Sequence, residues 1–184
     1  MSVEIVISKS NCCICKQLYI MKLNIKPGDM MSNVLITFFS ASGVTKSIAQ
    51  KIADENGYDV FEITPVEKYT AADLDYMDKN SRSTIEMNDK SFRPPIAETC
   101  DVSGYDIVAI GFPVWWYTAP TIINTFIESV DLSGKTIKVF CTSGGSGVDK
   151  CVSDLKDSYP ELNFTKGMRF TGNVSNAKGW IENE

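Results

Sequence analysis

One loop of this sequence gathers the residue types that bind a phosphate. It reads Ser40-Ala41-Ser42-Gly43-Val44-Thr45 and lies between an apolar run and a helical pattern. Hydroxyl groups and the free N–H groups of a helix N-terminus bind anions, and a glycine lets the backbone approach them closely. An ordinary helix cap is the alternative, because serine, threonine and glycine are common there. With Lys46 as the nearby cation, the loop favours a monophosphate held mainly by neutral donors.

A second loop is aromatic and suits a flat ring. It follows another apolar run and reads Pro113-Val114-Trp115-Trp116-Tyr117. Two adjacent tryptophans at a strand end cannot both point into the same core, so at least one should line a cavity or face a partner. Aromatic walls stack on planar ligands and exclude water. The alternative is that both tryptophans simply pack under the next helix.

A third loop is rich in glycine and reads Thr142-Ser143-Gly144-Gly145-Ser146-Gly147. Glycines let a chain lie flat beside a ring and leave N–H groups free to bind its carbonyl oxygens. A tight turn before the next helix is the alternative interpretation.

The elements that must position these loops alternate between strand and helix. Near-continuous apolar runs predict strands that are buried on both faces, and apolar residues at helical spacing predict the helices between them. We expect strands at 33–39, 58–64, 105–113, 135–142 and 162–170, and helices at 44–56, 71–79, 119–130, 148–158 and 175–183, the last with Trp180 inward. This order predicts an α/β fold in which helices cover both faces of a five-stranded parallel sheet. Ligands bind at the carboxyl ends of the strands in such sheets, which is where all three loops lie.

Other chemistries are poorly supported by the sequence. The chain has no histidine, which excludes Ser-His-Asp triads and HExxH zinc sites, and its 6 cysteines do not form a normal zinc ligand set. The Gly134-Lys135-Thr136 tripeptide precedes a strand and lacks the upstream glycine of a phosphate-binding P-loop, and no GxGxxG follows the first strand. We therefore expect no metal and no dinucleotide fingerprint.

Composition and charge restrict the partners. A net charge of −5 argues against nucleic acid, and no apolar run approaches the roughly 20 residues that cross a bilayer. Since a secretory signal is also missing, we expect a soluble, cytoplasmic protein with reduced thiols.

Residues 1–30 differ from the rest and end in the turn signal Lys26-Pro27-Gly28-Asp29. We interpret them as an N-terminal extension before a domain at 31–184, with Met31 as the functional start; an edge hairpin is the alternative.

The three loops together resemble the flavodoxin-like family. The matching motifs are SxSGxT after the first strand, GFPVWW after the third and CTSGGSG after the fourth. They are most similar to a short-chain branch of proposed NAD(P)H-dependent FMN oxidoreductases with a Pro-x-Trp-Trp loop. The resemblance spans residues 33–182 and implies a three-layer, doubly wound sheet of order 2-1-3-4-5 with non-covalent FMN. It implies phosphate contacts from Ser40, Ser42, Gly43, Val44 and Thr45, and ring contacts from Pro113, Val114, Trp115, Trp116, Thr142, Ser143, Gly144, Gly145 and Gly147.

The resemblance also implies redox chemistry in which no catalytic acid or base is needed. NADH or NADPH would pass electrons through FMN to a quinone or a similar small-molecule acceptor. The alternative is a flavodoxin-type electron carrier that docks on a redox protein, and a homodimer is left open. Because no glycine lies between Phe112 and Pro120, we expect this loop to avoid positive φ, which favours two-electron transfer. Tyr117 stands where relatives often have a small residue and is expected to narrow access to the ring.

Overall fold

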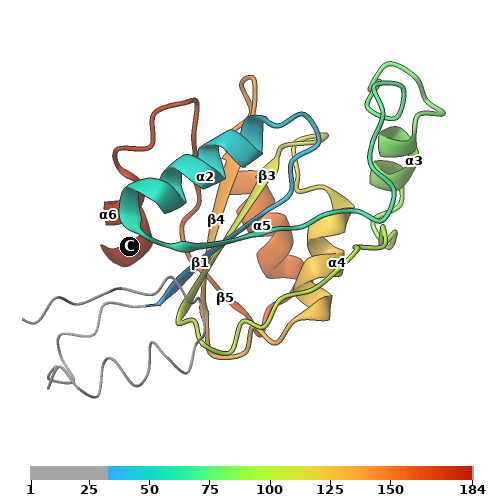
Figure 1. The fold of residues 1–184 in the computed structure, drawn as a ribbon. Coiled ribbons are helices and arrows are strands. Elements are labelled where there is room, and N and C mark those ends of the chain that lie inside the picture. The colour runs from blue at the N-terminus through green and yellow to red at the C-terminus, as the bar shows by residue number, and fades with distance from the viewer. Residues whose placement is uncertain (1–32, 184) are drawn as a thin grey trace, which may run out of the picture. The chain divides into compact units, whose positions relative to one another are not determined.

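A parallel sheet forms the centre of the computed structural model, which describes residues 33–183 (Figure 1). Its strands are β1 (Val34–Phe38), β2 (Asp59–Glu62), β3 (Ile107–Pro113), β4 (Thr136–Thr142) and β5 (Asn163–Phe164). They lie in the order β2-β1-β3-β4-β5 with every neighbour parallel, so the predicted order is confirmed. The proposed extension at residues 1–30 lies outside the described residues.

The fifth strand is shorter than its sequence pattern predicts. Instead of one strand over 162–170, the chain forms β5 and a second piece, β6 (Met168–Arg169), and both pieces pair with β4. Residues 165–167 between them are not part of a strand, although the N–H of Thr165 still donates to the Ile137 carbonyl of β4 at 3.0 Å. The next carbonyl, that of Lys166, accepts a hydrogen bond of 2.8 Å from the indole Nε1 of Trp180. The C-terminal helix thus contacts the edge of the sheet at this break.

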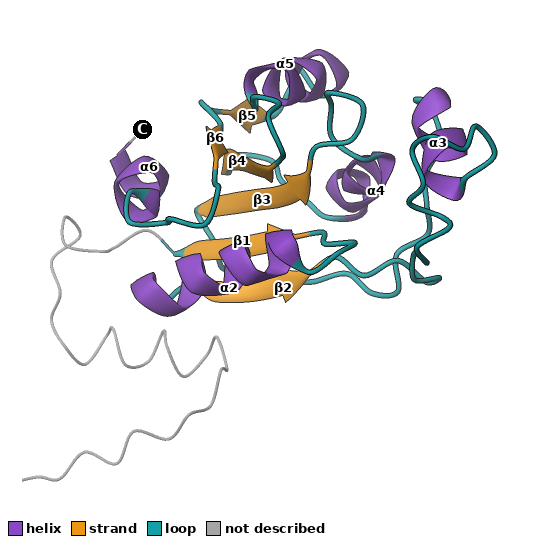
Figure 2. Ribbon diagram, turned by 90° about the horizontal axis from the view of Figure 1, so that it is seen from above, coloured by secondary structure: helices purple, strands orange, loops and turns teal. Residues whose placement is uncertain are grey.

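Helices cover both faces of the sheet, as the alternating pattern predicts (Figure 2). Apolar residues of α2 (Val44–Asn56) and α6 (Ala177–Asn183) share one core with β1 and β3, and those of α4 (Thr121–Ser129) and α5 (Asp149–Ser158) share the other. The inward position expected for Trp180 is confirmed, since its side chain is buried against Phe140 and Phe170. Within residues 33–183, no helix has the length and apolar character needed to cross a membrane.

The prediction of a helix near 71–79 is wrong. Those residues form turns, and the helix of this region is α3 (Arg82–Asn88), which stands apart from the sheet in Figure 1. Short acidic side chains explain the difference, because they accept backbone N–H groups in turns and so compete with a helix. Asp73 accepts the N–H of Thr70 at 2.7 Å, and Asp75 accepts that of Met77 at 2.9 Å.

The middle of the sheet depends on a close contact between Gly111 and Phe140. Gly111 on β3 pairs with Phe38 on one side and with Phe140 on the other. A Cβ atom on Gly111 would lie 2.0 Å from Cζ of Phe140, so the ring occupies the space that any side chain would need. The same ring makes edge contacts with Phe170 and Trp180, which prevent it from moving freely.

We predict that Gly111→Ala lowers the free energy of unfolding by at least about 1–3 kcal/mol, the usual cost of forcing an extra carbon into a packed core. Urea unfolding followed by circular dichroism measures this change. Gly179→Ala is the matched control, because Gly179 is exposed on α6 with no atom within 4 Å of an added Cβ. Better helix propensity should make that variant neutral or more stable by up to about 1 kcal/mol. Equal midpoints for the two variants would show that the Phe140 contact is not limiting.

Candidate functional site

The three loops of interest meet at one edge of the sheet. Parallel pairing sets Phe38 beside Gly111 and Pro113 beside Thr142, so the carboxyl ends of β1, β3 and β4 lie next to one another. A buried hydrogen bond of 2.8 Å joins the hydroxyls of Thr45 and Thr142 and ties the first turn of α2 to the end of β4. The N–H of Val114 donates to the carbonyl of Thr142 at 3.0 Å. Parallel strand pairing therefore brings together loops that are far apart in the sequence.

A cavity of about 680 Å³ opens between these loops, and we call it the central cavity. Its volume lies in the range of small-molecule sites. Eight of the predicted site residues line it: Ser42, Val44, Pro113, Val114, Trp115, Thr142, Ser143 and Gly144. Sequence reasoning missed its remaining walls, which are Ser47 and Ile48 on α2 and Phe170, Thr171 and Gly172 after β6.

The other predicted residues lie around this cavity in different ways. Gly43 adopts φ 86° and precedes α2, whereas the Thr45 side chain is buried in its bond to Thr142. Gly147 lines a smaller pocket beside Tyr117, and Trp116 lines the neighbouring cavity described below. Gly145 lines none of these cavities.

The start of α2 has the character of an anion site. Gly43 caps the helix without any side-chain hydrogen bond, so the N–H groups of the first turn stay available to a ligand. The buried hydroxyl oxygen of Ser40 finds no hydrogen-bond partner among residues 33–183. Lys46, the nearby cation, is engaged by Glu62 at 2.6 Å on the surface. An anion here would be held chiefly by neutral donors.

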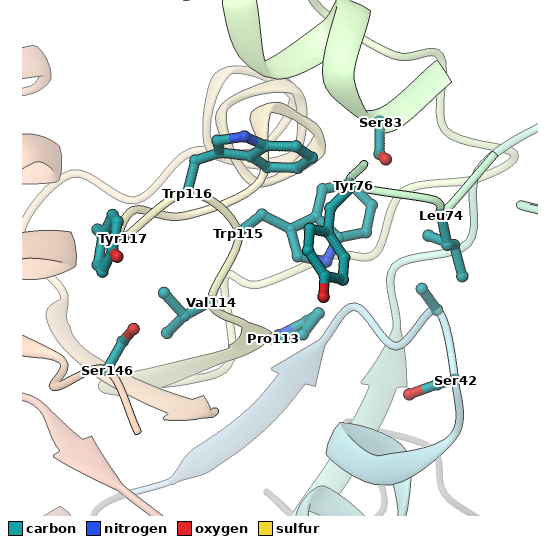
Figure 3. Close-up of a pocket in the computed structure, with 11 residues that line it drawn as sticks. Ser42, Leu74, Tyr76, Ser83, Pro113, Val114, Trp115, Trp116, Tyr117 and Ser146 are labelled. Carbon is teal, nitrogen blue, oxygen red and sulfur yellow. The ribbon is translucent and has the colours of Figure 1, made fainter. Parts of the chain in front are cut away.

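A second cavity of about 480 Å³ lies beside the central one, and we call it the side cavity (Figure 3). The two cavities share the wall residues Ser42, Pro113, Val114 and Trp115. The rest of the side cavity is formed by Ala41, Leu74, Tyr76, Ser83, Trp116, Tyr117 and Ser146. Leu74, Tyr76 and Ser83 come from the polar stretch at 66–104, where no motif pointed to a site.

An aromatic cluster fixes Trp115 in the wall between the cavities. Its ring meets Phe39 and Tyr69 edge to face, with centroids 5.6 and 5.3 Å away. Tyr69 donates its hydroxyl to Glu86 on α3, and burial with this bond raises the pKa of Tyr69 far above its ordinary value. Tyr69 therefore stays protonated and joins the 66–104 segment to the aromatic loop.

The aromatic loop contains a backbone conformation that the sequence argument excluded. Trp116 and Tyr117 adopt φ 45° and 66°, and Trp115 and Thr118 exchange backbone hydrogen bonds of 2.9 and 3.1 Å. This is a two-residue hairpin turn with positive φ at both central positions, where asparagine and glycine are the usual residues. The expectation that the loop avoids positive φ is wrong, because Trp115 pairs with Thr118 across the turn and Thr118 is itself held by Asp154 on α5.

The thiols near the site are poor nucleophiles. Cys141 and Cys151 are free and buried. Burial raises the pKa of Cys141 to about 12 and that of Cys151 to about 11, so both remain protonated at neutral pH. Thiolate chemistry is therefore unfavourable at this edge of the sheet.

We predict that Tyr117→Gly raises the free energy of unfolding by about 0.5–1 kcal/mol. The left-handed conformation costs an L-residue about 1–2 kcal/mol, part of which is offset by the greater backbone entropy of glycine in the unfolded chain. Thermal or urea unfolding measures the change. Tyr117→Ala is the control, since it removes the same exposed ring but keeps a Cβ at positive φ. Equal stabilisation by both variants would contradict backbone strain as the cause.

Comparisons with known proteins agree with this architecture. A comparison with curated sequences found no match. Among solved structures, a provisionally assigned flavoprotein from Bacteroides eggerthii is 43% identical with a TM-score of 0.79, covering 82% of this chain and 96% of its own. A similar protein from Bacteroides uniformis is 43% identical with a TM-score of 0.78, covering 83% and 99%. A flavoprotein from Lactobacillus acidophilus, solved in complex with FMN, is 27% identical with a TM-score of 0.64, covering 81% and 98%.

The family model described as flavodoxin matches residues 33–184, which include every strand and helix of the structure and all three loops. The chain belongs to the flavodoxin family.

Proposed function

We propose that this protein binds FMN in the central cavity. The observation that carries the proposal is the meeting of three loops around one cavity, with an unpartnered Ser40 hydroxyl and an uncapped helix N-terminus at one end. A phosphate at that end would satisfy both, because each offers hydrogen-bond donors without a protein acceptor. The FMN complex of the Lactobacillus acidophilus relative supports the same ligand.

The three loops would bind different parts of FMN. Ser40, Ser42, Gly43, Val44 and Thr45 would bind the phosphate through hydroxyl and backbone N–H groups. Pro113, Val114 and Trp115 line the central cavity and would exclude water from one side of the ring, while Thr142, Ser143 and Gly144 would offer backbone donors from the other. Trp116, Gly145 and Gly147 belong to the same two loops but lie outside the lining of this cavity, so they would contact the ring only at its edge. FMN supplies the electron-transfer chemistry when bound. No side chain of the chain itself needs to act as an acid or base.

We propose further that the protein is an oxidoreductase that takes electrons from NADH or NADPH and passes them through FMN to a quinone or a similar acceptor. The side cavity supports this proposal, since it shares four wall residues with the central cavity and would hold a second ligand beside the first. We assign this activity to the cytoplasm, in keeping with the free thiols of Cys100, Cys141 and Cys151.

An electron carrier is the second candidate, and the hairpin turn favours it. Trp116 and Tyr117 already occupy positive φ, so the sequence argument against backbone rearrangement beside the flavin no longer holds. Both rings are exposed, Trp116 by 40% and Tyr117 by 71%, and exposed aromatic residues are common where proteins dock. A redox protein would then be the partner in place of a small molecule.

We predict that the protein binds FMN with a dissociation constant of tens of micromolar or tighter, and riboflavin more weakly. Ser40→Ala should weaken FMN binding about ten- to hundredfold, the value of a hydrogen bond to a charged group, and leave riboflavin unaffected. Quenching of flavin fluorescence measures both constants. Thr125→Ala is the matched control, because it removes another buried, unpartnered hydroxyl that belongs to α4 and lines none of the cavities. Equal affinities for FMN and riboflavin would show that the 40–45 loop is not a phosphate site.

We also predict that NADH or NADPH bleaches the absorbance of the bound flavin directly under anaerobic conditions. The enzyme proposal requires this reaction, whereas a carrier receives its electrons from a partner protein. Stepwise reduction with dithionite is the companion measurement, because an enzyme that transfers two electrons at a time accumulates little half-reduced flavin. If half-reduced flavin accumulates and neither nicotinamide reacts, the carrier replaces the enzyme.

A further inference from the structure

The side cavity has walls that suit a flat, uncharged ring. Aromatic or apolar side chains form most of its surface, with Tyr76, Trp115 and Trp116 as the largest (Figure 3). The hydroxyl-bearing residues that line it are Ser42, Ser83, Ser146, Tyr76 and Tyr117, and no charged residue of the described chain does so. Such walls favour a planar ligand with few polar atoms.

The side-chain hydroxyl of Ser83, which lines this cavity, makes no hydrogen bond within the described protein. Ser83 is 1% exposed, and its hydroxyl oxygen has no hydrogen-bond partner among residues 33–183. Figure 3 shows this oxygen pointing from α3 toward the rings of Tyr76 and Trp115. Buried hydroxyls are normally paired, so an unpaired one that faces a cavity indicates a ligand that completes it.

The position of Ser83 is fixed by its neighbours on α3. Arg82 donates to Glu86 at 2.7 Å and also to the carbonyl of Glu67 at 2.8 Å. The N–H of Ser83 donates to the carbonyl of Asp73 at 3.0 Å. These bonds hold Glu67 and Asp73 against the first turn of α3. The Ser83 hydroxyl is therefore oriented toward the side cavity before any ligand binds.

We propose that the side cavity is the binding site for a quinone-type acceptor, with Ser83 donating a hydrogen bond to one quinone carbonyl and Tyr76 packing on the ring. This inference rests on the proposed function, which assigns FMN to the central cavity. Pro113 and Trp115 line both cavities, so a quinone in the side cavity would lie next to FMN in the central cavity. Reduction of the quinone to hydroquinone consumes two electrons and two protons. NAD(P)H would supply both electrons and one proton, solvent would supply the other proton, and FMN, when bound, would relay the electrons.

A nicotinamide dinucleotide fits the side cavity less well. Its diphosphate carries negative charge, which binding sites neutralise with arginine, lysine or a helix N-terminus. No lysine or arginine of the described residues lines the side cavity. The lining therefore selects a neutral ring over an anionic cofactor.

Titration calorimetry with duroquinone tests the site, using the full chain both free of flavin and loaded with FMN. Duroquinone carries a methyl group on each of its four non-carbonyl ring carbons, which hinders addition of the protein's thiols. We expect Ser83→Ala to raise its dissociation constant about three- to tenfold, the value of one neutral hydrogen bond. Tyr76→Ala should weaken binding as well, and because Tyr76 is 74% exposed this variant retains its fold.

Met77→Ala is the matched control. Met77 follows Tyr76, is 77% exposed and does not line the side cavity, so duroquinone affinity should not change. FMN affinity, measured by fluorescence quenching, should be the same in all three variants and the parent.

Three results would overturn the proposal: absence of duroquinone binding, equal affinity in Ser83→Ala and the parent, or competition between duroquinone and FMN. Competition would mean that the flavin ring itself fills the side cavity. A chain that fails to bind FMN but binds duroquinone with the expected dependence on Ser83 and Tyr76 would refute the proposed function and retain this site.

Discussion

The contact between Gly111 and the Phe140 ring is the constraint on which the site depends. Gly111 occupies the centre of the sheet near its carboxyl edge and pairs with β1 and β4 at once. Because it has no side chain, Phe140 can lie over it and join Phe170 and Trp180 in one aromatic cluster. This packing holds the three strand ends in register, and the register in turn decides which loop residues face one another across the central cavity.

The side cavity depends on a different interaction, the burial of the Glu86 carboxylate. Glu86 is 1% exposed and is paired with Arg82 and the Tyr69 hydroxyl, while the Arg82 guanidinium lies 4.1 Å above the centre of the Tyr69 ring. A buried charge is tolerated only when it is paired, so these partners are held in place. Through Tyr69 the cluster reaches Trp115, and through α3 it sets the position of Ser83. One ionic cluster therefore shapes both sides of the cavity.

The hairpin turn at Trp116 and Tyr117 shows how tertiary contacts can override local preference. Residues with large side chains normally avoid positive φ, and their presence here stores strain beside the candidate site. The turn is secured from its far end, where Thr118 donates its hydroxyl to Asp154 at 2.7 Å and Asp154 pairs with Lys150 on α5. Strained backbone persists only where the surrounding structure holds it in place, and such positions are common at functional sites.

The sequence by itself determined the first four strands, most of the helices and the three loops at the strand ends. These features follow from periodicity and from residues such as Gly57, which ends α2 in a left-handed conformation, so they need only local information. Tertiary structure alone decided how the 66–104 segment meets the aromatic loop and that Leu74, Tyr76, Ser83 and Phe170 form cavity walls. It also imposed positive φ on Trp116 and Tyr117. The physical reason is the same in each case: the deciding partners, Glu86, Asp154 and Trp180, lie far along the chain from most of the groups that they hold, and no local pattern records such contacts.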